Sequence, residues 1–212
     1  MKTSIALKSL LGAGALTLPL LAFAESTVQT GAATASPGAT AHVDFSIVIP
    51  KILYLRVGSG SAYTTGAATF LATVDLITFS PAAGTVGNGV AVAGTGGDLT
   101  GGVETAAIVS NSGNVTLNAT ATGALSDGSG DTIPFTQITT ATSALTSATQ
   151  LAAPTLTNAT SSNVVLTAPT SKVIVQDAKW TYSFANATNV PAGTYGGVNV
   201  NNGRVTYTAT MP

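Results

Sequence analysis

Apolar and polar side chains alternate most clearly between residues 42 and 57. The apolar members fall on odd positions: Val43, Phe45, Ile47, Ile49, Leu53, Leu55 and Val57. A period of two places successive side chains on opposite faces of an extended chain, and a helix cannot use it. Pro50 interrupts the run, because proline has no N–H to donate to a sheet ladder. The pattern therefore predicts two consecutive strands, residues 42–49 and 52–57, with a bend or bulge at Pro50.

Other stretches with strand-like patterns follow along the chain. They predict strands within residues 68–79, 90–93, 103–110, 114–122, 132–138, 162–168, 172–186 and 203–212. Short segments rich in glycine, asparagine and serine separate many of them, and these residues favour tight turns. Residues 141–160 are rich in Ala, Thr, Ser and Pro and only weakly patterned, so we expect a long surface excursion there, with or without a short helix.

Ten or more short strands joined by such turns are typical of an all-β domain. No unit of constant period repeats along the chain, which excludes propellers and solenoids. The fold class that we predict is an immunoglobulin-like Greek-key β-sandwich, formed as a single domain by residues 42–212.

The first residues have the features of a secretory signal peptide. Lys2 and Lys8 precede an apolar run at residues 10–21, and an Ala-Phe-Ala tripeptide ends at residue 24. We expect this signal to direct the protein to the periplasm, the cell surface or the extracellular space. We also expect residues 1–24 to be removed, after which no membrane-spanning segment remains. Residues 25–41 then form a flexible N-terminal arm. Its weak alternation makes it a candidate donor strand for assembly, carried by Val28, Thr30 and Ala32.

Charged residues make up only 7% of the chain, whereas a soluble domain typically has about 25%. The seven Lys and Arg face eight Asp and Glu, and loss of Lys2 and Lys8 changes the net charge from −1 to −3. Such a surface offers no basic patch for phosphates, so nucleic acid is excluded as a partner. The chain has no cysteine, and its fold must be held together by burial and sheet hydrogen bonds or by neighbouring subunits.

The sequence offers little catalytic or metal-binding chemistry. Its single histidine, His42, stands two residues before Asp44, but no serine occupies a recognisable nucleophile turn. One histidine and no cysteine are too few ligands for zinc or iron. Asp127 and Asp131 are weak candidates for a calcium site, with a plain hairpin tip as the alternative. We therefore predict a protein that is not an enzyme and that needs no cofactor.

Three aromatic residues could bind a sugar. Trp180, Tyr182 and Tyr195 would form a glycan platform if their rings were exposed together. The alternative is that Trp180 and Tyr182, which share one face of a strand with Phe184, belong to the core.

Two segments resemble a known group of proteins. "PAGTYGGVNVNNGRVTYTATMP", from Pro191 to Pro212, resembles the closing hairpin of bacterial fimbrial and spore-coat-type surface subunits. "VSNSGNVTLNATATG", from Val109 to Gly123, is similar to strands of the same pilin-like sandwiches. The resemblance implies an exported structural sandwich.

These observations favour a non-enzymatic, exported structural subunit of a bacterial surface fibre, pilus or coat that assembles by β-strand augmentation. Its expected partners are copies of itself or related surface subunits, together with a periplasmic chaperone. The alternative is a secreted carbohydrate-binding or adhesin module. An exported hydrolase is a third reading, with less support in the sequence.

Overall fold

The computed structural model describes residues 26–33, 38–60, 63, 73–161 and 163–212. Within these ranges the chain is all-β: its elements are twelve strands and two 3₁₀ turns, η1 (Ala83–Thr85) and η2 (Phe135–Gln137), without an α-helix. None of the described helical segments has the length and apolar character needed to cross a membrane. The chain divides into two units, Met1–Ile49 and Pro50–Pro212.

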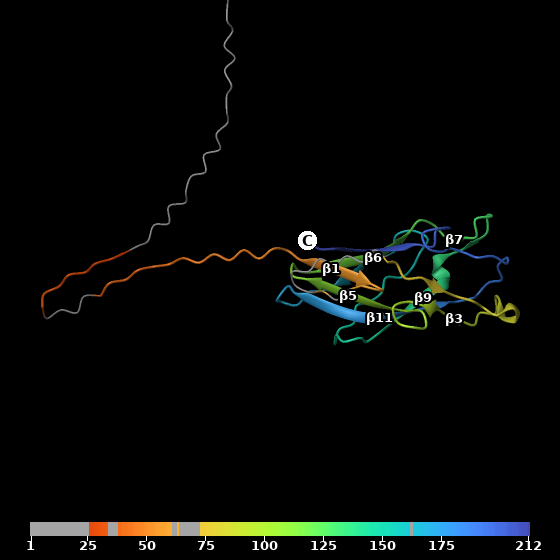
Figure 1. Cartoon of the computed structure of the whole chain (residues 1–212), viewed down its shortest axis with the longest axis horizontal. Helices are drawn as coiled ribbons and strands as arrows, with labels where there is room; N and C mark the ends of the chain where they lie inside the picture. The colour runs from red at the N-terminus through yellow and green to blue at the C-terminus, as the bar shows by residue number, and fades with distance from the viewer. Residues whose placement is uncertain (1–25, 34–37, 61–62, 64–72, 162) are drawn as a thin grey trace, which may run out of the picture. The chain divides into compact units, whose positions relative to one another are not determined.

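The first unit contains no strand or helix among its described residues, 26–33 and 38–49, and all of them are exposed. Figure 1 draws residues 38–49 as an extended trace without strand arrows. The prediction of a strand at residues 42–49 is therefore wrong for the single chain. The reason is that an extended segment becomes a strand only when a neighbouring edge accepts its hydrogen bonds. The second unit begins at Pro50.

The larger sheet of the second unit has five strands, all paired antiparallel. They are β1 (Leu53–Val57), β5 (Val103–Ser110), β11 (Ile174–Phe184), β3 (Val92–Ala93) and β9 (Ile138–Ser143). The order is β1-β5-β11-β3, with β9 also paired to β11. The labels of β1, β5 and β11 follow one another across Figure 1 in this order. β1 stands at the end of this order and has no partner on its outer side among the described strands.

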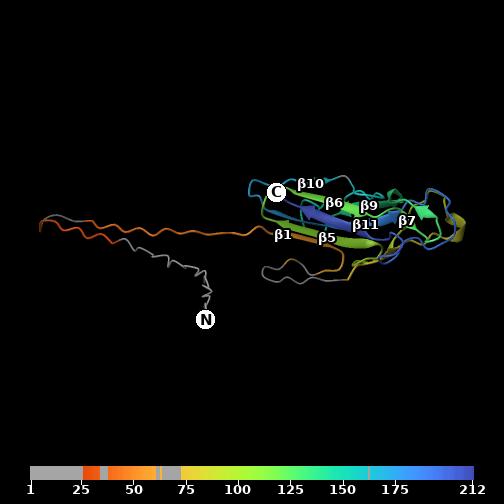
Figure 2. The ribbon, with the colours of Figure 1, turned by 90° about the horizontal axis from the view of Figure 1, so that it is seen from above.

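The smaller sheet has the order β10-β6-β12, again antiparallel. It consists of β6 (Val115–Ala121) between β10 (Val164–Leu166) and β12 (Val205–Thr210). Two minor pairs complete the described strands: β2 (Ile77–Thr78) with β4 (Thr95–Gly96), and β7 (Leu125–Ser126) with β8 (Thr132–Ile133). Figure 2 shows the strands from above, with β6 and β10 labelled over β5 and β1.

One hydrophobic core receives side chains from both sheets. β5 and β11 contribute Ala106, Ile108, Ala178 and Trp180, and β6 contributes Val115, Leu117 and Ala119. Trp180 is fully buried, and its Nε1 donates a hydrogen bond to the Leu151 carbonyl oxygen at 2.8 Å. The ring of Tyr207, from β12, lies 5.3 Å from that of Trp180, so the two sheets are in direct contact.

Several strand predictions are confirmed, among them residues 103–110, which form β5 with the expected bounds. The predicted strand at 132–138 is wrong in its middle, because Pro134 ends β8 and the chain turns through η2. The expected surface excursion at 141–160 is also wrong in part. β9 extends into it, and Leu151 and Leu156 are buried in the core. Residues 68–72 of another predicted strand lie outside the described residues, and only residues 77–78 of its remainder form a strand, β2.

Candidate assembly site

Residues 42–49 present a row of large apolar side chains to solvent. Val43 is 74% exposed, Phe45 90%, Ile47 86% and Ile49 76%. In an extended chain these four side chains share one face, and Asp44 and Ser46 occupy the other. A contiguous exposed apolar surface is typical of an interaction site. We call residues 42–49 the apolar segment.

The second unit contains a large groove of about 1160 Å³. Its walls come from segments far apart in the sequence. Leu55 and Val57 of β1 and residues 73–79 contribute to the lining, as do Val205 and Tyr207 of β12 and residues 189–195 and 197–199. Tyr182 and Phe184 of β11 also line the groove. The lining is therefore mainly apolar, and it includes β1 and β12, each of which stands at an edge of its sheet.

The core side chains of β12 are less covered than those of its neighbour. On β6, Val115 and Leu117 are fully buried. On β12, Val205 and Tyr207 point toward the same core but stay half-buried. β6 has a strand on each side, whereas β12 has one on a single side. β12 is therefore an edge strand of its sheet, and β1 of the larger sheet lies near it.

Two acidic side chains meet where β1 ends, at the groove wall. Glu104 of β5 is 5% exposed and makes a hydrogen bond with Asp75. Ser59 donates to Asp75 from its backbone N and from its Oγ, the latter at 2.7 Å. Burial raises the pKa of Glu104 to about 7, and the nearby charges of Asp75 and Asp98 add to the rise. A hydrogen bond from the Asp98 backbone N opposes it.

Two tyrosine hydroxyls lie close to each other in the same groove. The Oη atoms of Tyr182 and Tyr207 are 2.8 Å apart and share a hydrogen bond. Burial raises the pKa of Tyr207 to about 12 and that of Tyr182 well above its ordinary value. Both hydroxyls therefore stay neutral at physiological pH and act as structural hydrogen-bonding groups.

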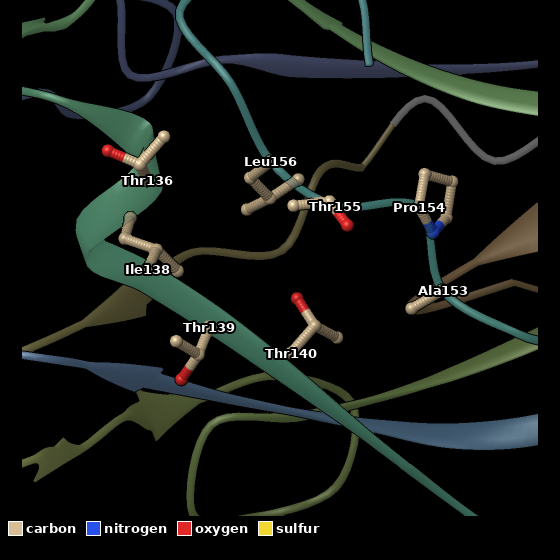
Figure 3. Close-up of a pocket in the computed structure, with 8 residues that line it drawn as sticks. All are labelled: Thr136, Ile138, Thr139, Thr140, Ala153, Pro154, Thr155 and Leu156. Carbon is tan, nitrogen blue, oxygen red and sulfur yellow. The ribbon is translucent and has the colours of Figure 1, made fainter. Parts of the chain in front are cut away.

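A second, smaller cavity of about 250 Å³ lies between β9 and residues 153–156. Figure 3 shows the hydroxyl groups of Thr140 and Thr155 directed into it, and that of Thr139 directed away. Thr140 Oγ1 is buried without a hydrogen-bond partner. The lining consists of Thr, Ile, Ala, Pro and Leu side chains and includes no acid, base or strong nucleophile.

The structure does not bring the three candidate aromatics onto one exposed surface. Trp180 is fully buried and Tyr182 is 6% exposed. Tyr195 is half-buried, and its hydroxyl donates to the Pro191 carbonyl oxygen at 2.8 Å. Tyr182 and Tyr195 both line the groove, but the indole of Trp180 does not. A flat platform that includes Trp180 is thus not formed.

Asp127 and Asp131 lie at the tip of the β7–β8 hairpin. Asp127 Oδ1 accepts hydrogen bonds from the backbone N–H groups of Ser129, Gly130 and Asp131, at 2.8, 3.1 and 3.0 Å. The bond from Ser129 contributes most to lowering the pKa of Asp127. Among the described residues no three His, Cys, Asp or Glu side chains are grouped so that they could hold a metal ion. Calcium binding at this tip stays a prediction.

The predicted N-terminal arm, residues 25–41, lies partly outside the described residues. Val28, Thr30 and Ala32 are exposed and belong to no strand. The sequence predicts a donor strand within residues 25–41 and places residues 42–49 in the folded domain. The signal that identifies the apolar segment was present in its alternation and in Pro50, which separates it from β1.

Comparisons with known proteins give no relative. No family model matches the chain, and neither the curated proteins nor the solved structures contain a match.

Proposed function

We propose that this protein is a non-enzymatic, exported structural subunit of a bacterial surface fibre, pilus or coat. Its second unit is an immunoglobulin-like Greek-key β-sandwich, and successive subunits are held together by β-strand augmentation. In this mode main-chain hydrogen bonds supply affinity, and side-chain pockets set the register. The predicted N-terminal signal and the low content of charged residues are consistent with a subunit that is exported and packs closely against its neighbours.

The exposed apolar segment is the single observation that carries the proposal. Exposure of four large apolar side chains to water is unfavourable, and covering that face lowers the free energy. Burying one Val, Ile or Phe side chain contributes about 1.5–3 kcal/mol, so the four together contribute roughly 6–12 kcal/mol before entropy costs. This contribution works against the cost of association and of ordering the segment, and main-chain hydrogen bonds add to it.

A comparison of two charge-matched variants of the exported chain tests the proposal. Phe45→Asp places a charge on the apolar face, and Ser46→Asp places the same charge one residue on, on the opposite face. Sedimentation velocity at increasing concentration and negative-stain electron microscopy report assembly. We expect wild type and Ser46→Asp to assemble and Phe45→Asp to stay monomeric. The association constant of Phe45→Asp should fall at least tenfold, because burying the Phe45 side chain contributes more than about 1.4 kcal/mol to the free energy of association.

Two results would remove the proposal. A wild-type chain that is monomeric at all concentrations shows no subunit behaviour, and a Phe45→Asp chain that assembles like wild type shows that the apolar face is not involved.

A further inference from the structure

We infer that the large groove of the second unit binds a long-chain fatty acid. The hydrocarbon chain lies along the apolar lining, and the carboxylate is held by the guanidinium group of Arg204. This inference goes beyond the proposed function and does not depend on it, because the groove belongs to the second unit and the apolar segment to the first.

The groove is large enough for a long hydrocarbon chain and is open to one. Its volume is about 1160 Å³, and pockets that bury a drug-sized ligand measure about 300–1,000 Å³. Its lining reaches the hydrophobic core at Ile133, Phe135 and Leu156, which are all buried. Val74 and Leu76 also line it, and they are 54% and 49% exposed. Apolar side chains therefore connect the core with solvent along this groove.

Several polar side chains of the lining already have hydrogen-bond partners within the chain. The hydroxyls of Tyr182 and Tyr207 bond to each other. Glu104 makes a hydrogen bond with Asp75. The side-chain amide of Asn186 accepts from a backbone N–H and donates to a backbone carbonyl oxygen. A ligand of this groove therefore does not have to supply partners for these groups.

Arg204, the residue before β12, is the exception. Among the described residues it is the only cationic side chain that lines the groove, and its Nε is buried without a hydrogen-bond partner. A buried donor without an acceptor costs free energy, and a buried charge without a counter-charge costs more. A carboxylate removes both costs, because its two oxygens accept paired hydrogen bonds from a guanidinium group.

A fatty acid combines the two features that the groove presents. A neutral apolar ligand leaves the Nε of Arg204 without an acceptor. A sugar places many hydroxyl groups against apolar side chains, where they lose their hydrogen bonds to water. A long-chain carboxylate covers the apolar lining and brings a single anion to Arg204. Charge complementarity thus selects the carboxylate among apolar ligands.

Competition for a fluorescent fatty acid tests the inference. The whole chain is titrated with cis-parinaric acid, and oleic acid and oleyl alcohol then compete with this probe. The two competitors have the same hydrocarbon chain, and only oleic acid carries a carboxylate. Arg204→Gln removes the cation and Arg204→Lys keeps it. Arg56→Gln is the matched control, since Arg56 belongs to β1 and does not line the groove.

A second pair of variants tests the apolar lining. Leu76→Asp places a charge on the lining, at a position that is 49% exposed. Val165→Asp places the same charge on β10, at a position that is 57% exposed and outside the groove. Phe45→Asp is included because the exposed apolar segment is the other surface of the chain to which a hydrocarbon could bind.

We expect oleic acid to compete at least about tenfold more strongly than oleyl alcohol, because hydrogen bonds to charged groups are stronger than neutral ones. Arg204→Gln should abolish this preference, whereas Arg204→Lys and Arg56→Gln should retain it. Leu76→Asp should weaken binding of the probe several-fold. Val165→Asp and Phe45→Asp should leave it unchanged.

No binding of the probe, equal competition by the two ligands, or an unchanged preference in Arg204→Gln would overturn the inference. The competition on the natural chain needs no variant, so it decides the matter even if Arg204→Gln fails to fold. Binding that is lost in Phe45→Asp and kept in Leu76→Asp would assign the probe to the apolar segment and also overturn it. So would binding to Phe45→Asp but not to assembled wild type, because protein would then fill the groove.

Discussion

Glu104 makes the stability of the second unit depend on pH in a direction that can be worked out. Its side chain is 5% exposed, and its pKa is raised from the ordinary value of 4.5 to about 7. Between these two pH values the folded chain holds a proton that the unfolded chain has released. Stability is therefore fully present below pH 4.5 and is lost as the pH rises through about 7.

The size of the effect follows from the pKa difference. One pKa unit corresponds to 1.36 kcal/mol, so the rise from 4.5 to about 7 predicts a loss of about 3 kcal/mol between pH 4.5 and 7.5. Replacement by glutamine keeps the size of the side chain and removes the titration. We expect Glu104→Gln to flatten the pH profile across this window. Asp127 does not interfere, because its pKa is lowered from an ordinary value of 3.8, below the window.

Urea unfolding at pH 4.5 and pH 7.5 measures the effect, with fluorescence of the only tryptophan, Trp180, as the signal. The Phe45→Asp background is used so that assembly does not contribute. Asp131→Asn, which replaces an exposed carboxylate, is the control and should keep the wild-type profile. Equal stability at the two pH values, or the same slope in Glu104→Gln, would refute the role assigned to Glu104.

Two further predictions concern the core and the turns. Leu117→Ala, at a fully buried position of β6, should lower the free energy of unfolding by about 2–5 kcal/mol, whereas Val165→Ala, 57% exposed on β10, should change it by less than about 1 kcal/mol. Urea unfolding distinguishes them, and equal costs would contradict the assigned core. Gly97→Ala should destabilise more than Gly101→Ala in thermal unfolding. Both glycines have positive φ, but an added Cβ at Gly97 would overlap the Val103 carbonyl oxygen, and at Gly101 it would meet open space. Equal melting temperatures would contradict this.

The alternation of side chains predicted much of the all-β architecture from sequence. It located β5 and β6 well, because both are strongly patterned and their apolar faces point into the core. β9 was missed beyond its first residue, since its sequence is rich in threonine. That strand is held by pairing with β11, a contact that its own side chains do not indicate.

The candidate site could be predicted only in part. The apolar segment is visible in the sequence, but alternation alone does not tell whether a strand finds its partner in its own chain or in another. The groove could not be predicted, because it joins residues of β1, β11 and β12 with the chain around residues 73–79. Its existence depends on which sheet edges stay unpaired, and this is a property of the whole topology.

Amide hydrogen exchange of the apolar segment tests the central claim most directly. In the monomer, residues 42–49 form no strand and are exposed, so their amides should exchange at the rates of an unstructured chain. In the assembled protein we predict strong protection of these amides. Assemblies in which residues 42–49 exchange as fast as in the monomer would contradict the account.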